Sequence, residues 1–238
     1  MKHSTFVITG TDTGVGKTVV ACLLTGCLLE TGVCVAALKP VGSGGRQDAR
    51  RLQAAAGGAL ALDEVNPWHF RAPLAPLLAA RGEKRRLRLA EILAHVRRIQ
   101  KRFQVVVVES AGGLLSPLGE GFTSRELVVA LKATPVVVCP NRLGAINQSL
   151  LVLAALPRSL SRRARIVLVS PARRDRSSRS NARYLAETLG PARVHVLHRL
   201  AHPAQPDRSL ADPRVRRIMR SLAAAGGFTQ AGWSRNRL

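Results

Sequence analysis

Aromatic and acidic residues are both scarce in this sequence of 238 residues. It holds five Phe, two Trp and one Tyr, which is little material for the stacking platforms of single-strand nucleic-acid binders. Asp and Glu number 14 against 37 Lys and Arg, so the formal net charge is +23, and only six of those 37 are Lys. Such an excess is typical either of a surface that binds phosphate-rich partners or of solvated charge. Because the basic residues are scattered along the chain, we favour solvated charge and expect no functional nucleic-acid partner.

Long uncharged apolar runs and paired cysteines are also lacking. No stretch of about 18 uncharged apolar residues occurs, so we expect no membrane span. The first four residues lead directly into an apolar run, without the pattern of a signal peptide. The four cysteines form no CxxC pair, and each lies in an apolar stretch, so we expect small buried residues in a reducing cytoplasm. They are Cys22, Cys27, Cys34 and Cys139.

Apolar runs alternate with helical patterns along the chain. Continuous Val, Ile and Leu runs are typical of parallel strands buried on both faces, so the alternation predicts an α/β fold of the P-loop type, with a doubly wound, mostly parallel sheet and helices on both faces. The predicted strands are 6–9, 33–38, 105–109, 136–139, 165–169 and 194–197. The predicted helices are 17–30, 90–103, one after Gly144, 181–189 and an amphipathic stretch at 215–222.

The chain is expected to form one domain over residues 1–225. Residues 226–238 are predicted to be a poorly ordered basic tail. Residues 47–89 are the least regular stretch and include a predicted helix from Asp48, so we expect an insertion over the edge of the sheet. In such sheets, binding sites lie beyond the carboxyl ends of the strands.

A glycine-rich loop follows the first predicted strand and opens the first helix. Residues 10–18 read GTDTGVGKT. Backbone N–H groups of such a loop bind phosphate oxygens, and the helix N-terminus adds favourable partial charge. Lys17 can reach the β- and γ-phosphates, while the Thr18 hydroxyl can ligate Mg²⁺. The strict phosphate-loop pattern has Gly where Thr11 stands, with Gly10 one place earlier, so the strand–loop–helix context carries this prediction.

Three charged residues lie at the ends of predicted strands or at the start of a predicted helix. Lys39 ends the second predicted strand, where a cation could stabilise charge on a transferring phosphoryl group, although Lys-Pro followed by glycines can be an ordinary loop. Glu109 closes the third strand, at the position of an acid that holds Mg²⁺. Asp48 is a second candidate ligand, and a helix N-cap is the alternative role for it.

These segments resemble the dethiobiotin synthetase family. Its phosphate loop reads GTDTxVGKT, its second strand ends in KPVxSG and its third in VEGAGG; the corresponding segments here are residues 10–18, 39–44 and 108–113. The family motifs NPxxF, PL…FT and LGxIN are similar to residues 66–70, 117–123 and 143–147. The resemblance covers roughly residues 5–200.

The resemblance implies a cytoplasmic, homodimeric cyclo-ligase that uses ATP and Mg²⁺. Its substrates would be 7,8-diaminopelargonate and CO₂, which forms a carbamate on one amine. ATP phosphorylates the carbamate, and the second amine attacks the resulting mixed anhydride to give dethiobiotin, ADP and phosphate.

The resemblance also assigns roles to residues. Lys39 would be the catalytic lysine, with Lys17 and Thr13 beside it. Mg²⁺ would be held by Thr18, Asp48 and Glu109, and the substrate would contact Ser43, Gly144 and Asn147. The implied nucleotide contacts are Gly14, Val15, Gly16, Lys17, Thr18, Val19, Asp48, Glu109, Ser110, Ala111, Gly112, Ser170, His198, Arg199 and Leu200.

The sequence departs from the family pattern at several positions. Leu77, Arg142 and Gln148 replace a His, a Lys and a His, and Ser170 stands where an Asn reads the base. These departures leave open a degenerate paralogue that binds nucleotide without making dethiobiotin.

Two alternative functions fit parts of the sequence less well. A partition- or septum-type ATPase that docks on DNA or membrane shares the fold, but it carries an extra Lys early in the phosphate loop, where residues 11–13 here are Thr, Asp and Thr. A histidine metal site at His195, His198 and His202 would need a helix, whereas the pattern predicts a strand there.

Overall fold

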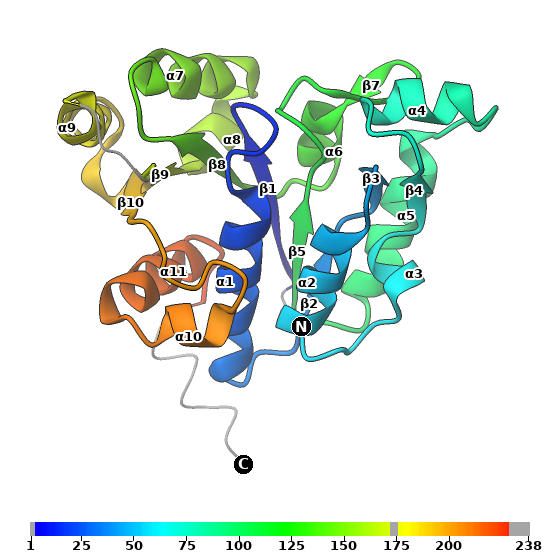
Figure 1. The fold of residues 1–238 in the computed structure, drawn as a ribbon, viewed down its shortest axis with the longest axis horizontal. Coiled ribbons are helices and arrows are strands. Elements are labelled where there is room, and N and C mark those ends of the chain that lie inside the picture. Colours follow the sequence, from blue (N-terminus) through cyan, green and yellow to red (C-terminus); the bar gives the residue numbers. More distant parts are fainter. Residues whose placement is uncertain (1–2, 172–175, 229–238) are drawn as a thin grey trace.

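The computed structural model describes residues 3–171 and 176–228 and is built on one parallel sheet (Figure 1). The order of the six strands is β10-β9-β8-β1-β5-β2, and all neighbouring pairs run parallel. The predicted α/β fold of the P-loop type, with a parallel sheet, is confirmed. The strands are β1 (Ser4–Gly10), β2 (Val35–Leu38), β5 (Val105–Glu109), β8 (Thr134–Pro140), β9 (Arg165–Val169) and β10 (Val194–Leu197).

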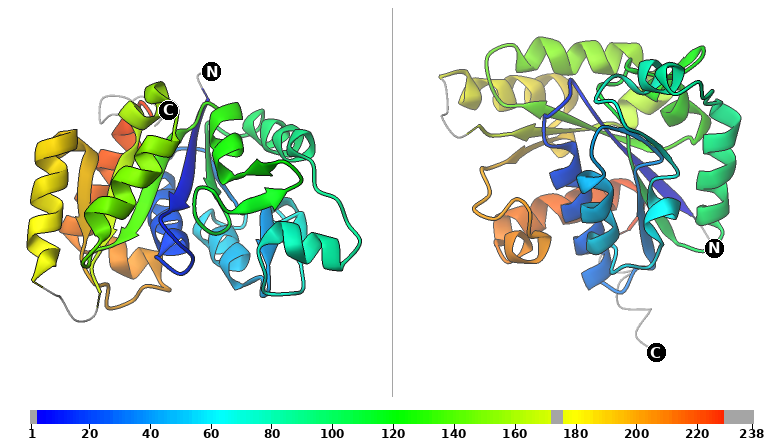
Figure 2. Two further views of the ribbon diagram at one scale, coloured as in Figure 1. Left: turned by 90° about the horizontal axis from the view of Figure 1, so that it is seen from above. Right: turned by 45° about the vertical axis from the view of Figure 1, so that its right-hand side comes forward.

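Helices cover both faces of this sheet (Figure 2). On one face α1 (Lys17–Glu30) packs against α10 (Pro206–Leu210) and α11 (Pro213–Ala225). The other face carries α5 (Leu89–Gln100), α6 (Ser124–Ala130), α7 (Ala145–Ala155), α8 (Arg158–Arg163) and α9 (Ser177–Leu189). A 3₁₀ turn, η1 (Pro191–Arg193), leads into β10.

The predicted insertion lies beside the edge strand β2. Here α2 (Gln47–Ala55) and α3 (Leu62–Val65) pack against β2, and β3 (Val41–Ser43) pairs with β4 (Trp68–Phe70). The short helix α4 (Pro76–Gly82) lies against β3 and β4. A second small pair, β6 (Pro117–Gly119) with β7 (Phe122–Thr123), is antiparallel. Because β2 has one free edge, this insertion provides the outer wall of the sheet's carboxyl end.

Apolar burial explains why the strands were recognisable in the sequence. Val105 to Val108 and Val136 to Val138 are at most 1% exposed, as expected for strands covered on both faces. Each such side chain contributes about 1.5–3 kcal/mol when fully buried, so the central strands dominate the core.

One cysteine and the first residues of the predicted tail differ from the expectations for them. Cys34 is exposed and lies just before the strand, which starts at Val35; the other three cysteines are buried, and all four are unpaired. Of the predicted tail, Gly226 accepts a hydrogen bond from Ser4 Oγ (2.7 Å) and Phe228 packs against the core. Residues 229–238 lie outside the described residues. Within the described ranges, none of the helices has both the length and the apolarity to cross a bilayer.

Candidate active site at the carboxyl edge of the sheet

The phosphate loop connects the end of β1 to the start of α1. Gly14 and Gly16 adopt left-handed backbone conformations with φ of 73° and 100°, which L side chains rarely adopt. Gly16 is the N-cap of α1, and no described side chain caps this helix end. The first N–H groups of α1 are therefore available to an anion, as the sequence predicts.

Lys17 is folded into this loop. Its side chain is nearly buried, and Nζ donates a hydrogen bond to the backbone carbonyl of Asp12 (2.7 Å). Burial lowers the pKa of Lys17, an effect that the nearby Glu109 opposes. An ammonium group held in this way at the loop faces the position that a bound phosphate would take.

Lys39 meets two carboxylates at the ends of β2 and β5. The register pairs Leu38 with Val108, so the next residues, Lys39 and Glu109, lie side by side. Lys39 Nζ donates to Glu109 Oε1 (2.9 Å) and also contacts Asp48 Oδ2 from the first turn of α2. Asp48 is thus a partner of Lys39 and not the N-cap of its helix, a position that Arg46 occupies.

Burial and charge shape the titration of this cluster. Burial alone would lower the pKa of Lys39, but Glu109 and Asp48 together raise it above its usual value. Burial would raise the pKa of Asp48, yet the hydrogen bond from Lys39 brings it below the usual value. Glu109 is 1% exposed, and its burial raises its pKa against the opposing charge of Lys39. Lys39 therefore stays protonated at neutral pH.

A cavity of about 230 Å³ brings these groups together. Gly112, which follows β5, closes it with φ of 66°, and a side chain there would collide with Ser116 Oγ. The predicted phosphate-loop, lysine and acid segments therefore converge. The lining residues are Thr13, Gly14, Gly16, Lys17, Thr18, Val19, Lys39, Asp48, Arg51, Glu109 and Gly112.

Other predicted site residues lie outside this cavity. Val15, Ser110 and Ala111 are buried behind it. Ser170 follows β9, and its N–H donates to Leu197 O (2.9 Å); His198, Arg199 and Leu200 follow β10. Gly144 and Asn147 begin α7, and Ser43 Oγ donates to Leu74 O (2.5 Å) on the insertion. All of these residues lie at or beyond the carboxyl ends of strands, where such sheets bind ligands.

Arg51 is a cavity residue that the sequence analysis missed. It lies three residues after Asp48 on α2, a spacing that places both on one helix face. It also lines an adjoining cavity, so Arg51 borders both. This second cavity is lined by Thr18, Val19, Cys22, Arg50, Arg51, Ala54, Ala55, Pro203, Ala204, Pro206 and Asp207.

The oxygen atoms around Glu109 suit a divalent cation better than the histidines do. Thr18 Oγ1 donates to Glu109 Oε1 (2.9 Å), while the buried Glu109 Oε2 has no partner among the described residues. His195 lies on β10, where burial lowers its pKa to about 4, and no cluster of three His, Cys, Asp or Glu exists within the described ranges. A cation here would compete with the Lys39 ammonium for Asp48 and Glu109.

Comparisons with known proteins find relatives by sequence. A family model described as an AAA domain matches residues 4–202. The ATP-dependent dethiobiotin synthetase BioD of Anaeromyxobacter dehalogenans (strain 2CP-C) is 43% identical over 155 residues, which cover 63% of this chain and 70% of that protein. The protein of the same name from Akkermansia muciniphila is 42% identical over 151 residues, covering 63% and 71%.

Solved structures of low sequence identity share the fold. The MinD cell division protein of Aquifex aeolicus superposes with a TM-score of 0.57 at 12% identity, covering 95% of this chain and 98% of that one. The structure described as "Cyanthece apo McdA" gives a TM-score of 0.55 at 14% identity, covering 94% and 99%. At such identities the likeness concerns the fold alone.

Proposed function

The chain belongs to the ATP-dependent dethiobiotin synthetase family, and from this premise we propose that it is the cyclo-ligase that closes the ureido ring of dethiobiotin. In the proposed reaction CO₂ forms a carbamate on one amine of 7,8-diaminopelargonate. A carbamate oxygen attacks the γ-phosphorus of ATP and ADP leaves. The second amine then attacks the carbonyl carbon of the mixed anhydride and expels phosphate.

One observation carries this proposal: Lys17 and Lys39 reach a single cavity from separate elements. Negative charge shifts among the phosphate oxygens during phosphoryl transfer, and fixed cations stabilise it without reorganising at the moment of reaction. Lys17 comes from the phosphate loop and Lys39 from the end of β2. Lys39 is the proposed catalytic group for the transferring phosphoryl, with Thr13 and Lys17 beside it.

Mg²⁺ is the proposed metal partner of ATP. Thr18, Asp48 and Glu109 would hold it, because hydroxyl and carboxylate oxygens are the ligands that Mg²⁺ prefers. The unpartnered buried oxygen of Glu109 supports this assignment. When bound, the ion would neutralise negative charge on the phosphate groups of ATP.

The proposed contacts with the nucleotide and the diamine lie along the same carboxyl edge of the sheet. The backbone of residues 14–19 is proposed to hold the triphosphate, assisted by residues 109–112. The nucleoside is proposed to lie toward Ser170 and residues 198–200. The diamine is proposed to contact Ser43, Gly144 and Asn147, which follow β2 and β8.

A homodimer is proposed through the apolar face beside α7. Leu143 is 78% exposed, Leu151 61% and Leu115 60%, and Leu115 and Leu151 line one groove with Asp12 of the phosphate loop. Large apolar side chains exposed together favour an interface. Leu151→Asp should therefore shift the sedimentation of the protein from dimer to monomer, with Leu78→Asp on α4 as the matched control, because Leu78 is 50% exposed but lies away from the groove.

A conversion assay tests the proposed activity. The protein is incubated with 7,8-diaminopelargonate, bicarbonate, ATP and Mg²⁺, and dethiobiotin is measured by mass spectrometry. Formation of dethiobiotin in equal amounts to ADP is expected, and omission of the diamine should abolish it. Nucleotide binding without any dethiobiotin would instead identify a degenerate paralogue.

A further inference from the structure

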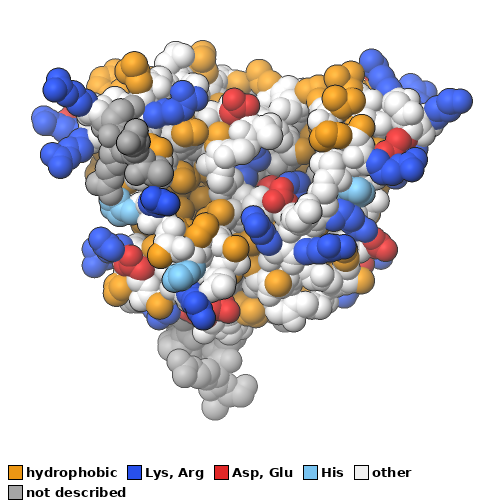
Figure 3. Space-filling model, viewed as in Figure 1, with side chains coloured by type: hydrophobic (Ala, Val, Ile, Leu, Met, Phe, Trp, Pro, Cys, Tyr) orange, Lys and Arg blue, Asp and Glu red, His pale blue; other side chains and the backbone are white. Residues whose placement is uncertain are grey.

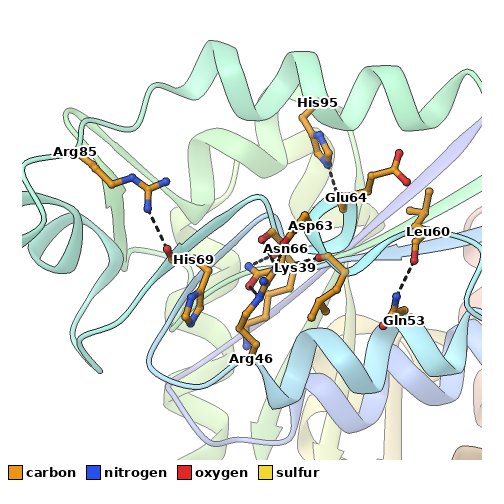
Figure 4. A network of polar contacts seen from close by, with 11 residues as sticks. Lys39, Arg46, Gln53, Leu60, Asp63, Glu64, Asn66, His69, Arg85 and His95 are labelled. Atoms are coloured by element: carbon orange, nitrogen blue, oxygen red, sulfur yellow. Dashed lines mark hydrogen bonds and ion pairs between the residues drawn. The ribbon is translucent and has the colours of Figure 1, made fainter.

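Lys39 is held at its backbone by the insertion and not by the sheet. β2 ends at Leu38, so Lys39 is the first residue beyond the strand pairing. Its N–H donates to Val65 O (2.9 Å), and its carbonyl accepts a hydrogen bond from Asn66 Nδ2 (2.7 Å). Both backbone groups of Lys39 are thus bound by two consecutive residues that lie outside the cavity. Figure 4 shows Asn66 beside Lys39.

Arg46 fixes the orientation of the Asn66 amide. Arg46 Nε donates to Asn66 Oδ1 (3.3 Å), and one Arg46 terminal nitrogen donates to the carbonyls of Asn66 (3.0 Å) and Leu62 (3.1 Å) and to Asp63 Oδ1 (2.8 Å). A guanidinium only donates, so the amide oxygen must face Arg46 and the NH₂ group must face Lys39 O. Asn66 is 2% exposed, and a reversed amide would leave buried groups unpaired.

The same amide also supports the loop that carries Ser43. A side chain at Gly42 would approach Asn66 Nδ2 to 3.2 Å, so the amide packs closely over the 39–42 segment. Trp68 N donates to Pro40 O (3.1 Å), which extends the contact by one more residue. The turn from Lys39 to β3 is therefore shaped by residues 65–68 and not by its own pairing.

We propose that Asn66 and Arg46 are positioning residues for Lys39, holding its backbone where the ammonium lies between Glu109 and Asp48. The inference rests on the proposed function, because it assigns Lys39 to phosphoryl transfer. Displacements of about 1 Å in a reacting group can cost about 10²-fold in rate. Arg46 and Asn66 would thus serve catalysis from outside the cavity, without contacting the substrate.

Kinetics provide the first test. Asn66→Asp keeps the size of the side chain and an oxygen for Arg46 but loses the donor to Lys39 O. We expect kcat to fall about 10-fold to 10²-fold while KM for ATP changes by less than about threefold, since the phosphate loop is untouched. Arg46→Ala should show the same split between kcat and KM. Unchanged kcat in Asn66→Asp would overturn the proposal.

Gln53→Ala is the matched control. Gln53 Nε2 also donates to a backbone carbonyl of the insertion, Leu60 O (2.9 Å), but within the described part of the chain its side chain makes no hydrogen bond to the Lys39 segment (Figure 4). Its kcat should equal that of the parent. An equal loss in Gln53→Ala would assign the effect to general loosening of the insertion and would also overturn the proposal.

A second readout does not require dethiobiotin. The sequence has only six lysines, so trace acetylation followed by peptide mass spectrometry can follow Lys39 against the exposed Lys84 and Lys101. We expect Lys39 to acetylate at least threefold faster in Asn66→Asp and Arg46→Ala, and at the parent rate in Gln53→Ala. If the parent makes no dethiobiotin, the proposed function fails while this measurement still decides the positioning. Equal Lys39 rates in all four proteins would overturn it.

Discussion

The Lys39 ammonium is bound by two carboxylates at the carboxyl edge of the sheet. It contacts Glu109 and Asp48, and a buried charge left without such partners would cost several kcal/mol, about 3–5 when one partner of a pair is removed. Held in this way, the cation needs little rearrangement when a phosphoryl group arrives. The carboxylates therefore have two uses, as counter-ions of Lys39 and as proposed ligands of the metal.

Replacement of Lys39 should separate catalysis from nucleotide binding. Lys39→Ala is expected to lower kcat by about 10²-fold or more, whereas the affinity for ATP, set mainly by the phosphate loop, changes little. Steady-state kinetics and calorimetric titration with ATP measure the two effects. Lys39→Met, which preserves most of the side-chain volume, controls for the loss of packing. Parent-like turnover in either variant would remove Lys39 from the mechanism.

Glu109 should control the metal requirement. Glu109→Gln keeps the shape of the side chain but removes its charge, so the Mg²⁺ concentration for half-maximal activity should rise at least tenfold. Titration of activity with Mg²⁺ at fixed ATP measures it. Asp63→Asn is a suitable control, because Asp63 is an exposed acid outside the cavity. Full activity of the parent in excess EDTA would contradict the assignment.

Ser170 should leave base discrimination loose. A serine presents one hydroxyl where an amide would offer a paired donor and acceptor, and a site without both groups cannot strongly reject the wrong base. GTP and CTP are expected to bind within about tenfold of ATP, a gap of about 1.4 kcal/mol. Ser170→Asn should widen that gap. Competition binding against a fluorescent ATP analogue measures it, and a thousandfold preference of the parent for ATP would contradict it.

Part of the site was predictable residue by residue. Lys39 and Glu109 each stand where a buried apolar run ends, and ends of parallel strands meet at one edge of a sheet. The contacts of Asn66 with Lys39 O and with Arg46 were not predictable. They join segments 20 to 27 residues apart inside an irregular insertion, where no periodicity indicates which side chains meet.

At the scale of elements, hydrogen bonds in the first turn of α6 fix the residue at which this helix begins. Thr123 is the N-cap, and its side chain accepts from Arg125 N (3.2 Å). Glu126 returns the contact by accepting from Thr123 N (2.8 Å) and Oγ1 (2.6 Å). Burial alone would raise the pKa of Glu126, but these hydrogen bonds and Arg125 bring it down to about 2. This capping box fixes where the helix begins after β7.

The cap of α6 should give a defined pH dependence of stability. A carboxyl whose folded pKa is lowered stabilises the protein above its unfolded pKa and loses that contribution as pH falls through the folded value. The difference in unfolding free energy between parent and Glu126→Gln should therefore be constant above about pH 5 and shrink toward pH 2. Thr123→Ala should cost about 1 kcal/mol at pH 7. Urea unfolding at several pH values measures both effects, and a pH-independent difference for Glu126→Gln would contradict the role.

Long elements were predictable from the sequence and short ones were not. β5, β9, β10 and α1 have the predicted limits, because continuous apolar runs end at Gly, Pro or charged residues. The pairs β3–β4 and β6–β7 have strands of two or three residues, too short to show an alternating pattern. The prediction that Cys34 would be buried was wrong for a related reason. Hydrophobicity alone does not distinguish the last residue before a strand from the first residue of the strand.

At the scale of the whole molecule, neither the fold nor the net charge by itself identifies the partner of this protein. The same fold occurs in the MinD cell division protein and is expected in the dethiobiotin synthetases that match this chain by sequence. The fold alone therefore does not decide the function. The charge of +23 would suit an anionic surface. In Figure 3, however, Lys and Arg are spread around this face among apolar and acidic side chains and do not form one continuous patch.

DNA should therefore have no effect on turnover. So basic a chain will bind duplex DNA at low salt, and this binding should weaken steeply as salt rises, because it depends on the release of counterions. Weak binding of that kind does not distinguish the two functions, whereas coupling does. In an ATPase that docks on DNA, nucleotide changes the affinity for DNA, and by linkage DNA changes the affinity for nucleotide. We expect ATP turnover at about 0.15 M salt to be unchanged by saturating duplex DNA, and DNA affinity to be equal with and without ATP. Stimulation of hydrolysis by several-fold would instead favour the partition-type ATPase, whose DNA-bound state is the active one.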